Sequence, residues 1–199
     1  ACLVGSEMCI RDRCWTSYVV TGDRKEVRDL YEKMKSLEDG QTSLAENDFG
    51  ETWLGNLVTI LGGDWSQVHC RGEFFKLQID SDDVAVRFET SSAWAEPRDI
   101  RYFIQSKYPS LKFYYRSEEP NMCIYTTNDE DGEYFPGRIL IKDYGRGPTY
   151  CQTWREAFQC IAEKTGVEIH NRKEMNRVLE TYNEEHEACR IDVHRFKIE

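Results

Sequence analysis

Apolar and polar residues alternate through much of residues 73–116, and this pattern predicts two strands, a helix and a third strand. The segments 73–79 and 84–90 have apolar residues at every second position, which is typical of an antiparallel hairpin with one polar face. The acidic residues 80–83 favour a turn between these two strands. The side chains expected to face the core are Phe75, Leu77, Ile79, Val84, Val86 and Phe88.

A helix and a strand are predicted to follow this hairpin. Pro97 suits the first turn of a helix, and the apolar residues within 100–104 share one helical face. We expect the helix to end before Pro109, because the residue that precedes a proline avoids the helical conformation. Alternation then resumes at 111–116, which predicts the third strand.

The preceding part of the chain supplies one more strand and helix. Residues 16–21, TSYVVT, predict a strand, and the helix after it opens with Asp23 and Glu26 at the spacing of a capping box. Residues 40–71 form an irregular insertion before the hairpin. This order predicts an α+β, ferredoxin-like β-α-β-β-α-β fold, with an antiparallel sheet and both helices on one face.

The C-terminal part is predicted to add a hairpin and further helices. Residues 122–128 and 134–143 flank an acidic turn and predict a second hairpin that extends the sheet. Thr153 with Glu156, and Asn171 with Glu174, have capping-box spacing, so each pair predicts the start of a helix. A last strand is expected within 191–198.

These elements predict three segments along the chain. A ferredoxin-like domain covers 14–145 and contains the insertion 40–71, and a C-terminal helical extension covers 146–199. Residues 1–13, ACLVGSEMCIRDR, show neither a helical nor a strand period and resemble translated sequencing-adapter sequence. We expect them to form an artefactual or disordered tail.

Several short segments of the chain resemble the YubB-type ferredoxin-like domain family, which occurs in small proteins of plasmids, phages and related mobile elements. The segments are TSYVVTGDRKEV (16–27), RFETSSAWAEP (87–97), KYPSLKF (107–113) and the acidic bend SEEP (117–120) with the hairpin after it. The resemblance covers 14–143, but VHCRGEFFKL (68–77) stands where the family often has a Trp-rich segment. It implies a ferredoxin-like fold and a mobile-element setting. It implies no established activity, so no functional residue is transferred.

The charge balance narrows the classes of partner. The formal net charge is −10, which argues against general binding to the nucleic-acid backbone and allows a basic partner. Acidic mimicry of nucleic acid is a further alternative, and it requires the acids to gather on one face. The sequence has no run of 18 or more apolar residues, so we expect no membrane span.

The eight cysteines do not indicate a metal or disulfide framework. They include no C-x-x-C pair and have no Cys or His neighbour at zinc-finger spacing. We therefore expect reduced thiols in a cytoplasmic protein, with no metal and no cofactor.

Several short patterns invite chemical interpretations, and each has a plainer structural explanation. They are His69-Cys70, the acidic loop 128–132, Glu118-Glu119, and the glycine segments 62–64 and 145–147. Adjacent residues of extended backbone point to opposite faces, so neither pair is well arranged for catalysis. A calcium loop requires a bidentate Glu where this chain has Arg138, and the glycine segments lack the Lys of a phosphate-binding loop.

An aromatic groove is the remaining candidate site. We hypothesise that it binds a peptide or small molecule, and ordinary packing of the same rings is the alternative. Its residues are Trp53, Trp65, Trp94, Tyr102, Tyr114 and Tyr125. The leading functional hypothesis is a non-enzymatic interaction module that binds a protein or peptide partner. The alternative is a small-molecule-binding or enzymatic domain that uses an aromatic pocket around Trp53, Trp65 and Trp94.

Overall fold

The computed structural model describes residues 13–41 and 49–199, which form a mixed α+β structure. The α+β class predicted from the sequence is therefore confirmed. Residues 1–12 of the predicted tail and residues 42–48 of the predicted insertion lie outside the described part of the chain. Arg13, which the prediction assigned to the tail, is the first residue of a strand.

The chain divides into two compact units, Ala1–Ile124 and Tyr125–Glu199. The predicted boundary between 14–145 and 146–199 therefore lies too far along the chain. The reason is that the strand Ile139–Asp143 forms its hydrogen-bonded pairs with later strands of the second unit. The segment after residue 145 is accordingly a mixture of strands and helices and not a purely helical extension.

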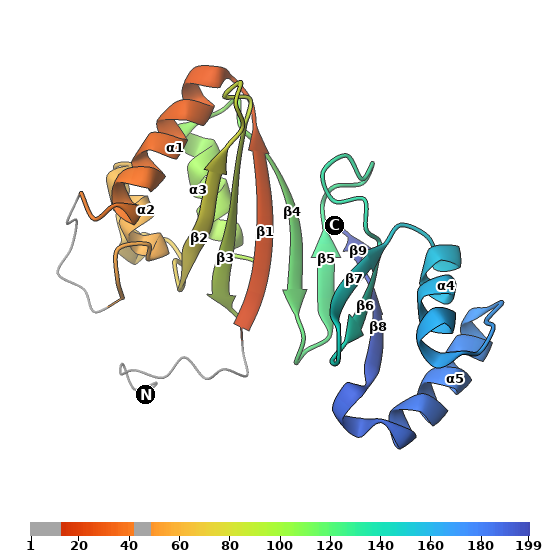
Figure 1. The fold of residues 1–199 in the computed structure, drawn as a ribbon. Helices are drawn as coiled ribbons and strands as arrows, with labels where there is room; N and C mark the ends of the chain where they lie inside the picture. Colours follow the sequence, from red (N-terminus) through yellow and green to blue (C-terminus); the bar gives the residue numbers. More distant parts are fainter. Residues whose placement is uncertain (1–12, 42–48) are drawn as a thin grey trace. The chain divides into compact units, whose positions relative to one another are not determined.

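The first unit contains a sheet with the strand order β2-β3-β1-β4 (Figure 1). Its strands are β1 (Arg13–Thr21), β2 (Gly72–Ile79), β3 (Ala85–Ala93) and β4 (Lys112–Glu119). All pairings within this order are antiparallel. Tyr18 of β1 pairs with Phe88 of β3 and with Tyr115 of β4, so these three aromatic side chains share one face of the sheet.

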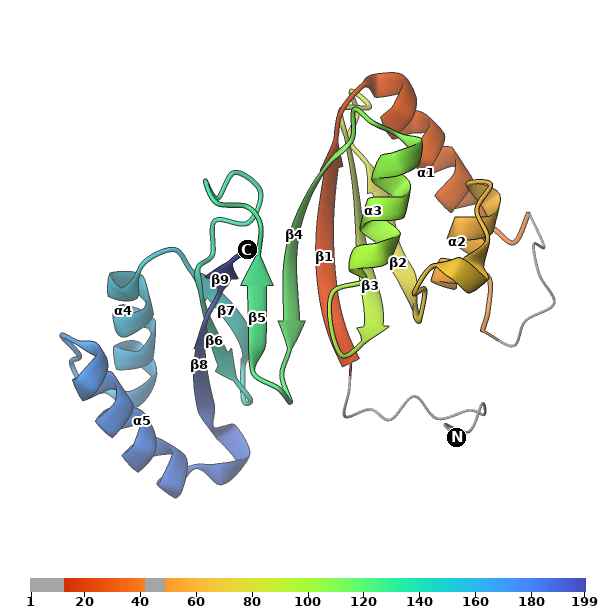
Figure 2. The same cartoon turned by 180° about the vertical axis from the view of Figure 1, so that it is seen from behind.

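Helices cover that face of the sheet (Figure 2). They are α1 (Arg24–Glu38), α2 (Leu54–Ile60) and α3 (Arg98–Lys107). The Asp23 side chain accepts a hydrogen bond from the backbone N–H of Lys25 and so begins α1. Glu26 does not complete the predicted capping box, because its carboxylate binds the backbone N–H and the hydroxyl of Ser110 instead.

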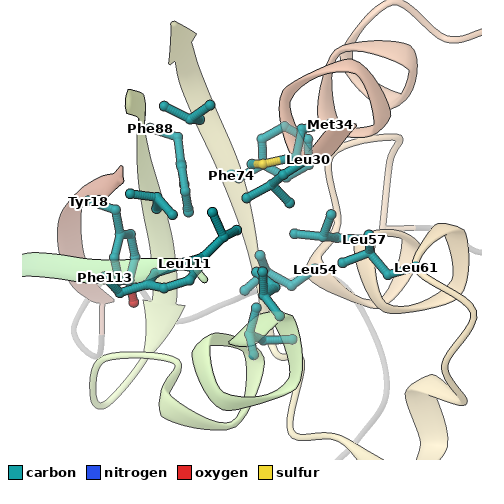
Figure 3. Packing of buried hydrophobic residues seen from close by; sticks show 14 of the residues in the cluster. Tyr18, Leu30, Met34, Leu54, Leu57, Leu61, Phe74, Phe88, Leu111 and Phe113 are labelled. Carbon is teal, nitrogen blue, oxygen red and sulfur yellow. The ribbon is translucent and has the colours of Figure 1, made fainter. Parts of the chain in front are cut away.

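The hydrophobic core of the first unit lies between these helices and the sheet (Figure 3). Leu30 and Met34 of α1 are fully buried, as is Phe74 of β2. Leu54 and Leu57 of α2 are also fully buried, so part of the predicted insertion belongs to the core. Each such side chain contributes about 1.5–3 kcal/mol of hydrophobic stabilisation, which explains why the short helix α2 is held in place.

Strand β2 departs from the predicted alternation at a bulge. Lys76 has a φ angle of 54°, and the register with β3 shifts between Phe75 and Gln78. Because of this extra residue, Phe74 is fully buried in the core and Phe75 lies on the opposite face. The inward orientation predicted for Phe75 is wrong, as is that of Val84, which is 42% exposed. The residues of the predicted hairpin that do pack in or against the core are Leu77, Ile79, Val86 and Phe88.

The second unit contains a sheet with the order β7-β6-β8 and two helices. These elements are β6 (Ile139–Asp143), β7 (Gly147–Cys151), α4 (Trp154–Thr165), α5 (Arg172–Glu185) and β8 (Ile191–Arg195). Two short strands, β5 (Ile124–Thr127) and β9 (Lys197–Ile198), pair in parallel. Apolar side chains of α4 and α5 pack against the β7-β6-β8 sheet and give this unit a core of its own.

The predicted hairpin of 122–128 with 134–143 does not form. Strand β6 pairs with β7 and β8 instead of with the earlier segment. The acidic residues between them do not make a two-strand turn, because the buried carboxylate of Asp129 accepts the backbone N–H groups of Tyr134 and Phe135. This loop turns around Asp129, and Gly137 leads into β6.

Both helix starts predicted in the C-terminal part are confirmed. The Thr153 hydroxyl accepts the backbone N–H of Glu156 over 3.2 Å, and the Asn171 side chain accepts that of Glu174 over 3.0 Å. Gly166 ends α4 in the left-handed conformation at φ 73°. The spacing of polar caps and apolar stripes was therefore sufficient to locate these helices.

Candidate functional site

An open groove of about 360 Å³ lies at the β2 edge of the first unit. Trp15 and Phe75 line it, together with the carboxylate-bearing residues Glu38 and Glu73. Thr52 and Phe74 complete its lining. The groove therefore combines aromatic surface with two acidic side chains.

Strand register brings the aromatic and acidic residues together. Trp15 of β1 lies opposite Ser91 of β3, and Ser91 lies opposite Glu73 of β2, so all three side chains share one face. Phe75 lies two residues after Glu73, before the bulge in β2, and so shares that face; the centres of the Phe75 and Trp15 rings are 5.7 Å apart in an edge-to-face contact. Trp15 remains 44% exposed, so a ligand in the groove can reach its ring.

The charges around the groove suit a cation. Glu38, the last residue of α1, is paired with Lys35 over 2.9 Å. The Glu73 carboxylate forms no hydrogen bond or ion pair within the described residues 13–41 and 49–199. The ammonium of Lys76 already lies 5.8 Å from the centre of the Phe75 ring. An aromatic face beside an unneutralised carboxylate is an arrangement that binds guanidinium or ammonium groups.

The same edge is poorly suited to adding a further strand. The backbone N–H of Phe74 is already used by the Thr52 carbonyl at 3.0 Å, and Trp53 bridges Glu73. Beyond them, Lys76 bulges out of the ladder. Recognition here must therefore use side chains and not a continuous backbone ladder.

The six aromatic residues of the hypothesised groove do not gather at one place. Trp53 is buried in the core, and the centre of its ring lies 5.4 Å from that of Trp65, so these two residues do lie together. Trp94 is 51% exposed in the connection between β3 and α3. Tyr102 of α3 stacks with the Arg101 guanidinium at 4.7 Å.

The other two residues of that hypothesis lie elsewhere. Tyr114 points to the sheet face opposite the helices, as predicted from the alternation in β4. Tyr125 belongs to the second unit, where it is buried with Leu140 and Phe196. The groove described above therefore rests on residues that the sequence analysis did not select, namely Trp15, Glu73 and Phe75.

A buried polar network occupies the helix-facing side of the same sheet. The Tyr18 hydroxyl donates to Glu96, and the Cys14 thiol contacts the Ser117 hydroxyl at 3.0 Å. Burial raises the pKa of the Cys14 thiol, and it also raises that of Cys70. Both thiols are therefore protonated at neutral pH, and neither has the thiolate character of a nucleophile.

The acidic and histidine motifs of the sequence have structural partners. Glu119 is fully buried, and its carboxylate accepts backbone N–H groups of the following turn, whereas Glu118 pairs with Arg116 at 3.7 Å. His69 binds Asp99 at 2.5 Å and so links the insertion to α3. No cluster of three or more His, Cys, Asp or Glu side chains within the described ranges could hold a metal ion.

Comparison with family models, with curated protein sequences and with solved structures finds no match to this chain. Of the helices in the described part of the chain, none has the length and apolar character required to cross a membrane.

Proposed function

We propose that the first unit is a ferredoxin-like domain of the YubB-type family and comes from a mobile genetic element. The order of elements, with α2 as an insertion, and the strand order β2-β3-β1-β4 support this proposal. They correspond to two split β-α-β units with antiparallel neighbours and helices on one face. The family and the mobile-element setting rest on the sequence segments that resemble it.

We further propose that the protein is a non-enzymatic interaction module that binds a basic segment of a partner protein. The observation that carries this proposal is the groove in which Trp15 and Phe75 lie beside the carboxylate of Glu73, which has no polar partner in the described part of the chain. An Arg or Lys side chain of the partner would lie against the aromatic rings and pair with this carboxylate. Such contacts combine cation–π attraction with a charge-assisted hydrogen bond.

The charge of the whole chain favours the same class of partner. A net charge of −10 attracts a basic segment and repels a nucleic-acid backbone. The cytoplasmic setting remains part of the proposal, because the described cysteines are free thiols.

The alternative of a small-molecule or enzymatic domain around Trp53, Trp65 and Trp94 has less support. Trp53 is 8% exposed and stacks on Phe49 at 5.0 Å, so a ligand there would have to displace packed side chains. The protonated thiols described above also supply no nucleophile. These observations favour the interaction module.

The proposal is tested with fluorescein-labelled peptides that carry Arg at alternate positions, and with a matched set in which Gln replaces Arg. Binding to the full chain is measured by fluorescence anisotropy at two salt concentrations. We expect the Arg peptides to bind to the wild-type chain. Glu73→Lys should lower their affinity at least tenfold, because one hydrogen bond to a charged group is worth about 1.5–3 kcal/mol.

Glu32→Lys is the control, since it changes the net charge equally at an exposed position of α1 outside the groove. It should retain most of the affinity. Equal weakening by both variants would mean that the peptides respond only to overall charge, and the groove would then not be the binding site. Equal binding of the Arg and Gln peptides would also overturn the proposal.

A further inference from the structure

The thiols of Cys151 and Cys160 face each other in the second unit. Their Sγ atoms are 3.9 Å apart, and they come from the end of β7 and from α4. The backbone of Cys151 is held in the sheet, because its carbonyl accepts the N–H of Arg138 over 2.8 Å. The two sulfur atoms are thus juxtaposed by elements whose backbones are fixed.

The two thiols differ in their access to solvent. Cys151 is 2% exposed, whereas Cys160 is only partly buried. Burial, with a further contribution from the Cys160 thiol, raises the pKa of Cys151 to about 12. Cys160 is therefore the residue that a soluble oxidant reaches first, and Cys151 is a protonated thiol directly beside it.

We propose that Cys151 and Cys160 form a reversible disulfide when the protein meets a hydroperoxide such as hydrogen peroxide. The Cys160 thiolate attacks one peroxide oxygen, the O–O bond breaks, and the released hydroxide takes a proton to form water. Cys160 is then a sulfenic acid. The Cys151 sulfur attacks the Cys160 sulfur, the S–O bond breaks, and the departing hydroxide accepts the Cys151 proton.

These steps balance, because two thiols are oxidised to one disulfide and one hydrogen peroxide is reduced to two waters. The sulfur atoms must approach from 3.9 Å to about 2.05 Å. The bond would connect residues nine positions apart and fasten the middle of α4 to the end of β7. Oxidation therefore joins the helical layer of the second unit covalently to its sheet.

The other described cysteines provide internal controls. Cys14 contacts hydroxyl groups, and Cys70 and Cys123 contact the backbone carbonyls of Trp65 and Pro120. Cys123 and Cys189 are both exposed. An oxidant that acted only according to exposure would modify Cys123 and Cys189 before Cys151.

The experiment treats the reduced full chain with increasing hydrogen peroxide and then alkylates the remaining thiols under denaturing conditions. Intact-mass measurement and peptide mapping of the wild-type chain identify which cysteines have lost hydrogen. The expected result is a linked peptide pair that contains Cys151 and Cys160, formed without dimerisation and reversed by dithiothreitol.

Two variants sharpen the test. Cys151→Ser should leave a sulfenic acid at Cys160 that dimedone traps, while a Cys123→Ser, Cys189→Ser double variant should still form the linked peptide. The proposal is overturned if Cys151 and Cys160 of the wild-type chain remain alkylatable while Cys123 and Cys189 oxidise. Because this result comes from the wild-type chain, it does not depend on whether a variant folds.

Discussion

The hydroxyl of Tyr18 donates a hydrogen bond to the Glu96 carboxylate over 2.7 Å, and so joins the centre of the first sheet to the connection that leads into α3. The same carboxylate accepts Nε–H of Arg101 over 3.0 Å. The guanidinium of Arg101 lies 5.2 Å from the centre of the Tyr115 ring. The hydroxyl, the carboxylate and the guanidinium are largely removed from water, so each depends on the others for its polar contacts.

Removing the carboxylate of this network should destabilise the first unit strongly. Glu96→Ala leaves the Arg101 guanidinium buried without its partner, and we expect a loss of about 3 kcal/mol in the free energy of unfolding. Denaturant unfolding followed by circular dichroism measures the effect. Glu32→Ala, at an exposed position of α1, is the control and should change little. A loss in Glu96→Ala no larger than in this control would contradict the network.

The network also predicts a loss of stability at high pH. Burial, and then the negative charge of Glu96, raise the pKa of Tyr18 well above 10.0. A raised pKa means that the folded state holds the proton more tightly, so the stability is fully present below pH 10 and falls as the pH rises further. Unfolding measured between about pH 8 and pH 11 should show this fall, and Tyr18→Phe should flatten it.

The bulge in β2 predicts opposite sensitivities for two adjacent phenylalanines. Phe74→Ala should cost about 3–5 kcal/mol, because its fully buried ring leaves a cavity in the core. Phe75→Ala should cost less than about 1.5 kcal/mol, because this ring is partly exposed on the opposite face. Thermal and denaturant unfolding of the two variants compare them directly. The reverse order would mean that β2 follows a regular alternation without a bulge.

The second unit should lose stability in acid through Asp143. Burial tends to raise the pKa of this carboxyl, but Lys164 at 2.7 Å and the backbone N–H groups of Gly145 and Arg146 lower it below 3.8. Because the folded state binds this proton less tightly than the unfolded state, the Asp143 carboxylate stabilises the fold above pH 3.8. This contribution is lost as the pH falls through the pKa that the carboxyl has in the folded state. Asp143→Asn should reduce this dependence, as measured by unfolding between about pH 2 and pH 6. An unchanged acid profile in Asp143→Asn would rule out this role.

Much of the first unit was predictable because its signals are local. The apolar stripe and the Asp23 cap locate α1, and alternation locates β3 and β4. The bulge at Lys76 was not predictable, because adjacent Phe74 and Phe75 fit either phase of alternation equally well. Only the pairing with β3 decides which ring enters the core.

The second unit was predicted less well because the sequence pattern does not show which segments pair with β6. The prediction joined 122–128 to 134–143 as neighbours, whereas β6 pairs with the following strand β7 and with β8, which lies about fifty residues further along the chain. The candidate groove was missed for a related reason. Trp15 and Glu73 meet only through the registers of β1 and β2 with the strand between them, and these registers are not visible in either segment alone.

Lys76 affects the edge of β2 and not the packing of its apolar residues in the core. Without it, Phe74, Leu77 and Ile79 would still alternate inward, so the core does not need this residue. Without the bulge, the border of β2 beyond Phe75 would be more regular and so better suited to pairing with another strand. Lys76 thus interrupts the border of β2 while the inward-facing positions on either side of it keep the same phase.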